Sequence, residues 1–311
     1  MKYLTRFGLF LAGLFGCCPI THADPITFTF TNINVPGGAI TSLNSINNAG
    51  QIVGTDGQHG FLYTNGVFTN IDVPGAIATI PSKINNLGQI AGTYRDSSNR
   101  LNLFLDTNDV FTTINVPGNL DFAESLESVP RVGLNDLGQI VGTTDLSPYG
   151  ITAFLYSNGQ FSFIPARGGI LNASAAFDIN NAGQIALQEA TNGSTRFLSY
   201  VYFNGNYTQI DSFVSSFPTG INNAGHVVGH DYQIGSRTLS YFYADGEITT
   251  FVYDPSLPLP PFYFINGLND ADQLVGTGPG GGVLATPVPE PASLLLFAGG
   301  LTVVGLLLRR K

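Results

Sequence analysis

Few residues in this chain are suited to metal binding or nucleophilic chemistry. Only four histidines and two cysteines occur among its 311 residues. His226 and His230 would share one face of a strand, which is a spacing that a metal site can use. They stand, however, where other copies of a repeat carry Gln and Thr. We interpret both as variation within that repeat, and we predict no metal and no cofactor.

Carboxylates offer a second route to chemistry, because glycosidases use a pair of them. The densest acidic cluster is formed by Asp121, Glu124 and Glu127, which also fits a solvated loop. The recurring Asn-Asn and Asn-Asp pairs lack the alternating acidic positions of calcium loops. No G-x-S-x-G sequence marks a nucleophilic serine. The sequence therefore favours a non-catalytic protein, with a polysaccharide-acting hydrolase or lyase as the alternative.

The recurring pairs belong to a nonapeptide that the chain repeats six times. The copies are INNAGQIVG from Ile46, INNLGQIAG from Ile84, LNDLGQIVG from Leu134, INNAGQIAL from Ile179, INNAGHVVG from Ile221 and LNDADQLVG from Leu268. Neighbouring copies are 38 to 50 residues apart. This period is about the length of a four-stranded propeller blade.

Each copy predicts a tight turn between two strands. In the first, we expect Asn47 to cap its own turn and Gly50 to take a positive φ, a conformation that Asp272 tolerates in the last copy. Asn65-Gly66 and its counterparts predict a second hairpin in most units. The first unit then has strands near 42–46, 51–55, 60–64 and 67–73, rich in Val, Ile, Phe and Tyr.

Residues 26–37 copy the outer strand of a unit, although no unit precedes them. The last unit lacks that strand. We therefore predict an all-β, six-bladed β-propeller over residues 24–286, closed by the N-terminal strand, which removes two open edges. An open β-solenoid is the alternative, because a period alone does not prove closure.

The N-terminal segment predicts export. Residues 1–23 combine a basic start, an apolar run and a small-residue cleavage site, as in a secretory signal peptide. Cys17 and Cys18 would leave with it. A lipoprotein signal with an acylated Cys17 is the alternative.

The C-terminal segment 287–311 contains Pro289-Glu290-Pro291, an uncharged run over 292–308 and a basic cluster. This order resembles the PEP-CTERM sorting signal of Gram-negative bacteria. The resemblance implies an exosortase as partner, transient anchoring in the inner membrane by a hydrophobic helix, and release or transfer at the cell surface, often in producers of exopolysaccharide. An ordinary C-terminal membrane anchor is the alternative.

The repeat unit also resembles the extracellular HAF-repeat family, through His59-Gly60-Phe61 and Ala153-Phe154. That resemblance implies a repeat structure and no single activity.

Charge and loop composition limit the choice of ligand. The chain has 21 acidic and 12 basic residues, and five of the basic ones lie in the terminal segments, so nucleic acid is excluded as a partner. The variable loops of a meander lie on one face of a propeller, where binding sites are common. We predict that this face binds glycan or an envelope protein through Tyr94, Arg95, Tyr149, Asp231, Tyr232, Arg237, Tyr253 and Tyr263.

Overall fold

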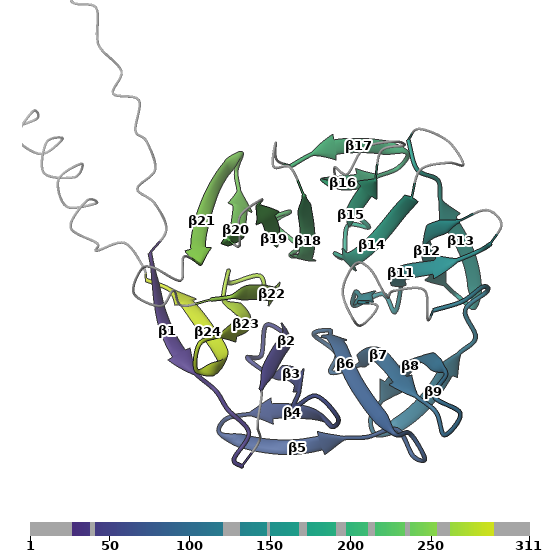
Figure 1. Ribbon diagram of the computed structural model, residues 1–311, viewed down its shortest axis with the longest axis horizontal. Helices are drawn as coiled ribbons and strands as arrows, with labels where there is room; N and C mark the ends of the chain where they lie inside the picture. Colours follow the sequence, from purple (N-terminus) through teal and green to yellow (C-terminus); the bar gives the residue numbers. More distant parts are fainter. Residues whose placement is uncertain are drawn as a thin grey trace, which may run out of the picture.

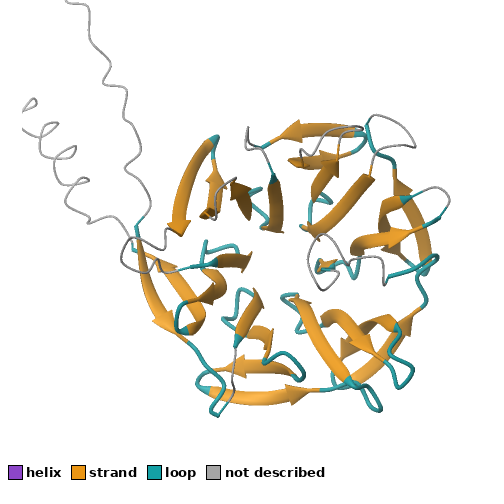
Figure 2. Ribbon diagram, viewed as in Figure 1, coloured by secondary structure: helices purple, strands orange, loops and turns teal. Residues whose placement is uncertain are grey.

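The structure is a computed structural model that describes residues 27–37, 41–120, 131–147, 150–167, 173–190, 197–210, 215–233, 237–253 and 262–288. Six four-stranded antiparallel sheets stand around a central axis in a closed ring (Figures 1 and 2). The regular elements of the described residues are all strands, and none of these residues forms a helix long and apolar enough to cross a bilayer. The predicted all-β, six-bladed propeller is confirmed.

The first three blades follow the chain from the inner strand to the outer one. Blade 1 comprises β2 (Ser42–Ile46), β3 (Ile52–Thr55), β4 (Gly60–Thr64) and β5 (Val67–Ile71). Blade 2 comprises β6 (Ala78–Ile84), β7 (Ile90–Arg95), β8 (Leu101–Thr107) and β9 (Val110–Ile114). Blade 3 comprises β10 (Gly133–Leu134), β11 (Ile140–Asp145), β12 (Ile151–Ser157) and β13 (Gln160–Ile164).

Blades 4 and 5 keep this order, and blade 6 departs from it. Blade 4 comprises β14 (Ala173–Ile179), β15 (Ile185–Ala190), β16 (Phe197–Phe203) and β17 (Asn206–Gln209). Blade 5 comprises β18 (Ser216–Ile221), β19 (Val227–Gln233), β20 (Arg237–Ala244) and β21 (Glu247–Tyr253). Blade 6 comprises β22 (Phe264–Leu268), β23 (Leu274–Gly278), β24 (Gly281–Pro287) and, as its outer strand, β1 (Phe28–Asn32).

The N-terminal strand closes the ring as predicted. β1 pairs antiparallel with β24, from Phe28 opposite Pro287 to Asn32 opposite Val283 (Figure 1). The loop after β1 leads into blade 1. The chain therefore leaves blade 6, makes a full circuit and returns to blade 6.

The hydrophobic core lies between the blades. Six clusters of buried residues each join two neighbouring blades. Between blades 1 and 2, for example, Val53 and Ile71 pack with Ile84, Ile90 and Phe104. Both faces of each sheet are thereby covered, which explains why polar residues do not alternate strictly along the strands.

The turn chemistry follows the sequence prediction. Gly50 has φ +75° and Asp272, in the one copy without glycine, has φ +54°. The Asn47 side chain caps its turn, because its Oδ1 accepts hydrogen bonds from the N–H groups of Ala49 at 3.1 Å and Gln51 at 3.0 Å. Asn65 and Gly66 both have positive φ, as a two-residue hairpin of this type requires.

Five of the six inner strands contain a register shift of the β-bulge kind. In β6 the shift falls between Pro81 and Lys83, and in β14 between Ala176 and Asp178. A bulge re-aims the side chain that follows it. The shift falls just before the nonapeptide in these five units, and in blades 2 and 4 it precedes Lys83 and Asp178, which meet near the axis.

Candidate functional site

The six nonapeptide turns lie together on one face of the ring, around the axis. We call this the turn face, defined by residues 47–50, 85–88, 135–138, 180–183, 222–225 and 269–272. A cavity of about 40 Å³ opens there, lined by residues of all six blades. The opposite face, where second strands connect to third strands and blades connect to one another, is called the connection face.

A closed ring of hydrogen bonds joins the first asparagines of the six turns. Each Nδ2 donates to the backbone carbonyl of the equivalent asparagine in the next blade, at 2.9 to 3.1 Å. The members in order are Asn47, Asn85, Asn135, Asn180, Asn222 and Asn269, whose Nδ2 returns to Asn47. All six side chains are buried. Each residue thus fixes its own turn through Oδ1 and the next blade through Nδ2.

A second closed ring, made by more exposed residues, accompanies the first. The backbone N–H at the second position of each turn donates to Oδ1 of the second-position side chain in the next blade, at 2.8 to 2.9 Å. The members are Asn48, Asn86, Asp136, Asn181, Asn223 and Asp270. The Oδ1 atoms of Asn and Asp both serve as this acceptor, so the ring accounts for the presence of Asn or Asp at this position in all six copies.

The two carboxylates of the second ring occupy opposite blades, 3 and 6. Asp136 Oδ2 accepts the Nδ2 groups of Asn86 at 3.0 Å and Asn181 at 2.7 Å. Partial burial raises the pKa of Asp136, but the hydrogen bonds from these two asparagines outweigh burial, and the net effect lowers that pKa. The carboxylate is therefore ionised at neutral pH.

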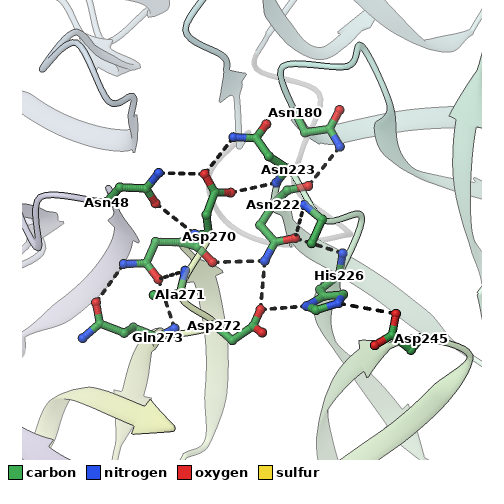
Figure 3. Close-up of polar contacts among 12 residues, drawn as sticks. Asn48, Asn180, Asn222, Asn223, His226, Asp245, Asp270, Ala271, Asp272 and Gln273 are labelled. Atoms are coloured by element: carbon green, nitrogen blue, oxygen red, sulfur yellow. Dashed lines mark hydrogen bonds and ion pairs between the residues drawn. The ribbon is translucent and has the colours of Figure 1, made fainter.

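Asp270 repeats this arrangement in blade 6. Its Oδ2 accepts Nδ2 of Asn48 at 2.7 Å and of Asn223 at 2.8 Å (Figure 3). Burial again raises the pKa of Asp270, while these asparagines and the positive charge of Lys83 lower it, with a net decrease.

Below the rings, charged side chains cross the axis. Lys83 of blade 2 donates to Asp178 Oδ2 of blade 4 at 2.5 Å, over the intervening blade 3. Blade 3 carries Gly133 at this level, where an added Cβ would lie 2.5 Å from the Asp178 Cα. Burial raises the pKa of Asp178, while Lys83 and the N–H groups of Ile221 and Ile179 oppose the rise.

A second contact crosses the axis between blades 3 and 6. Arg131 donates from Nη2 to Asn266 Oδ1 at 2.9 Å. The Nδ2 of Asn266 in turn donates to the carbonyl of Leu43 in blade 1, also at 2.9 Å. These polar groups hold blades together across the axis.

The boundary between blades 5 and 6 differs from the others. In the other five units, Nδ2 of the first asparagine also donates to a glutamine Oε1 of its own unit, at 2.7 to 2.8 Å. Unit 5 has His226 in place of that glutamine. Asn222 Nδ2 donates instead to Asp272 Oδ1 of blade 6 at 2.9 Å, and the same oxygen lies 2.8 Å from His226 Nδ1 (Figure 3). Asp245 Oδ1 lies 4.0 Å from His226 Nε2.

His226 and His230 do not meet. His230 is fully buried and packs between Phe217 and Phe264, with ring centroids 5.4 and 5.3 Å away. Within the part of the chain that the structure describes, no group of three or more His, Cys, Asp or Glu side chains is arranged to hold a metal ion. Asp121, Glu124 and Glu127 lie outside the described residues.

The predicted binding residues on the connection face divide between opposite sides of the ring. The strands run further than predicted, so Tyr94 and Arg95 end β7 of blade 2, and both make local contacts. The Tyr94 hydroxyl lies 2.9 Å from Thr113 Oγ1, and Arg95 Nη1 donates to the carbonyl of Asn99 at 2.9 Å. Tyr149 lies outside the described residues.

The other predicted residues belong to blades 5 and 6. Asp231 was predicted in a loop, but it lies within β19, is 1% exposed and accepts the N–H of Ser215 at 2.9 Å. It therefore holds the backbone of blade 5. For Tyr232, Arg237 and Tyr253 the structure describes the backbone only. Tyr263, half-buried, donates its N–H to the carbonyl of Thr277 at 2.7 Å.

Comparison with known proteins supports the fold and the C-terminal signal. Residues 287–311 match the PEP-CTERM protein-sorting motif. A putative TolB from Agrobacterium tumefaciens superimposes with a TM-score of 0.57 at 12% identity, covering 80% of this chain and 91% of its own. The gluconolactonase XC5397 from Xanthomonas campestris gives 0.52 at 12%, covering 81% and 88%. No curated protein was found to match the chain.

These likenesses define the protein as a six-bladed propeller with a PEP-CTERM sorting signal. At such low identity the structural neighbours establish the fold alone. The signal implies export, sorting to the cell surface and processing by an exosortase-type enzyme.

Sequence reasoning missed the two rings. It assigned the asparagine pairs to their own turns, which explains the first asparagine but not the second. The sequence did contain a pattern that could have revealed the second ring. A turn of this type needs only one capping side chain, yet all six copies have Asn or Asp at both positions.

Proposed function

We propose that the protein is a non-catalytic binding module of the cell surface, whose ligand is a glycan or another envelope component. One observation carries this proposal. The polar groups along the axis, where side chains of six blades converge, form the two asparagine rings and the cross-axis contacts. These hydrogen bonds hold the blades rigidly together. A rigid ring is a scaffold on which loops can present a binding surface.

We place the ligand on the connection face of blades 5 and 6. The register sets Tyr232 opposite Thr238, and Thr238 opposite Tyr253, in one row across three strands. Tyr263 begins the adjoining blade, and its carbonyl accepts Ser240 Oγ of blade 5 at 3.4 Å. Three tyrosines thus belong to one region, and tyrosine offers both a stacking face and a polar hydroxyl to a sugar. Tyr94 and Arg95, on blade 2, are not part of this site.

Charge narrows the class of glycan. The chain carries a formal net charge of −9, which disfavours a polyanionic partner. A neutral polysaccharide is therefore the expected ligand. Before processing, the tail would hold the protein in the inner membrane of a Gram-negative bacterium.

A glycan array and a reducing-sugar release assay on the exported protein test the proposal. We expect binding to neutral glycans without release. Tyr253→Ala and Tyr263→Ala should each weaken binding about tenfold, the effect of losing about 1.4 kcal/mol of stacking. Tyr94→Ala is the matched control and should bind like the parent. Sugar release by the parent protein would instead establish the polysaccharide-acting enzyme.

A further inference from the structure

The two ends of the described chain lie side by side at one end of blade 6 (Figure 1). β1 pairs with β24 without interruption, and the pairing continues past β24, because the Val288 N–H donates to the Thr27 carbonyl at 2.8 Å. Val288 directly precedes Pro289, the first residue of the sorting motif. The strand β1, which closes the ring, therefore pairs with the C-terminal segment up to the residue before the motif.

Side chains hold β1 in place as well as backbone bonds. Phe28 contacts Phe242 and Phe251 of blade 5, with ring centroids 6.1 and 5.8 Å apart. Beyond β1, Asn34 donates from Nδ2 to the Gly280 carbonyl at 2.7 Å and accepts the Gly282 N–H at 2.9 Å. These contacts keep β1 paired when the ring is closed.

The sequence leaves little space between this pairing and the membrane. The apolar run begins at Ala292, four residues after Val288. Four extended residues span at most about 14 Å. Before the tail is removed, blade 6 must therefore stand close to the bilayer and to any membrane-embedded processing enzyme. A protease takes up an extended, unpaired segment, and chain within a sheet becomes such a segment only by local unfolding.

We propose that ring closure presents the sorting motif to its processing enzyme: pairing with β1 protects the chain through Val288, and the enzyme engages the motif on the closed ring. This inference rests on the sorting signal and not on the proposed ligand. The partner is a membrane-embedded, exosortase-type enzyme. The protein it releases then has one defined C-terminus, beyond Val288, and keeps its closing strand.

Two proline variants of the full chain test the protection, in a host that has an exosortase. Along an antiparallel pair of strands, hydrogen-bonded and non-hydrogen-bonded residue pairs alternate. The hydrogen bonds Val288–Thr27 and Ile33–Gly282 show that odd-numbered residues of β1 are in the hydrogen-bonded pairs. Thr31 is therefore hydrogen-bonded to β24, and Asn32 is not. Thr31→Pro breaks the ladder, whereas Asn32→Pro removes an N–H that points away from β24. We expect products of Thr31→Pro that end before Val288, with at least about fivefold less intact protein. Asn32→Pro should resemble the parent in yield and terminus, read by mass spectrometry.

If Thr31→Pro does not fold, a cross-linked variant tests whether the enzyme acts on the closed ring. Thr29 and Thr286 are directly opposite, at a Cα separation typical of such pairs of about 5.5 Å, which a disulfide accommodates. The variant Thr29→Cys with Thr286→Cys locks β1 onto β24. We expect the locked protein to be processed at the rate of the same protein after reduction. A lock that stops processing would show that the enzyme needs an open ring, and the proposal would be overturned. An unchanged product from Thr31→Pro, with the ladder shown to be open by hydrogen exchange, would also overturn it.

Discussion

The turns of neighbouring blades are joined by different side chains at two boundaries of the ring, between blades 1 and 2 and between blades 5 and 6. Between blades 1 and 2 the turns are joined by neutral amides, and Asn47 Nδ2 also reaches Gln51 of its own unit. Between blades 5 and 6 a histidine and an aspartate replace the glutamine and the glycine of the repeat, and the two replacements touch. Two substitutions that look independent in the sequence are therefore one exchange across a boundary.

The exchange has a cost and a compensation. Asp272 adopts φ +54°, a conformation that disfavours any residue with a Cβ by about 1 kcal/mol. In return its carboxylate accepts from Asn222 and pairs with His226 at 2.8 to 2.9 Å. Hydrogen bonds to a charged acceptor contribute about 1.5 to 3 kcal/mol each. Compensation between neighbouring blades thus preserves the ring where the repeat pattern is lost.

The largest expected effect comes from removing the Asp272 carboxylate. Asp272→Ala keeps a Cβ at the left-handed position but deprives Asn222 and His226 of their acceptor. We expect it to lower the free energy of unfolding by about 3 kcal/mol, and Tm by roughly 6 to 12 °C. Gly88→Ala is the control at an ordinary boundary, where φ is +77° and no atom lies within 4 Å of the new Cβ. It should cost only about 1 kcal/mol, from the strain of a new Cβ at a left-handed position. Because the parent already carries a Cβ at position 272, an unchanged stability of Asp272→Ala would mean that the carboxylate contributes nothing.

A double-mutant cycle measures the compensation directly. His226→Gln and Asp272→Gly each restore one consensus residue and should each destabilise the protein. Together they restore the arrangement of the other units, in which glutamine accepts from asparagine. Urea unfolding should give a coupling free energy of about 1 to 2 kcal/mol. Strictly additive effects would contradict the view that the two replacements are one exchange.

The smallest expected effect concerns the carboxylates of the second ring. Asp136 serves the boundaries of blade 3, and Asp270 those of blade 6, so Asp136→Asn and Asp270→Asn form a matched pair. Each should cost about 1 kcal/mol at neutral pH. Because the pKa of each carboxylate is lower in the folded protein than its ordinary value of 3.8, protonation favours unfolding. The advantage of the parent is therefore present above pH 4 and lost as the pH falls below it.

Thermal unfolding between pH 2 and 7 checks this dependence. Parent and variants should converge at the acid end of the range. A larger loss for Asp270→Asn than for Asp136→Asn would show that the boundaries of blade 6 depend more strongly on charge than those of blade 3 do. A difference that persists unchanged at pH 2 would exclude carboxylate ionisation as its cause.

The sequence predicted the fold well because the fold is repetitive and its turns are local. The strands expected in the first unit differ from the observed ones by at most two residues at an end. The closing strand was found because residues 26–37 copy an outer strand. The two rings between blades were not predicted, since their hydrogen bonds join residues 38 or more positions apart, and the repeated Asn or Asp at the second position was assigned only to its own turn.

The candidate site was predicted less well. Asp231 was placed in a loop because it follows the expected second strand of its unit, yet that strand runs on to Gln233 and packing of blade 5 buries Asp231 within it. His226 was interpreted as variation without consequence, because its partner lies in another repeat 46 residues away. Which loop residues gather on one side depends on the order of blades around the axis, and this became clear only from the closed ring.

The closing strand has a consequence for the time course of folding. The hydrogen bond from Thr29 Oγ1 to the Thr286 carbonyl at 3.3 Å joins residues 257 positions apart. Closing a loop of that length in a flexible chain costs about 5 kcal/mol of entropy, which no local contact can repay. The blades, built from neighbouring strands, fold first and reduce this cost by bringing the two ends together. We therefore expect closure of the propeller to be the last step of folding, reached only after β24 has left the export machinery.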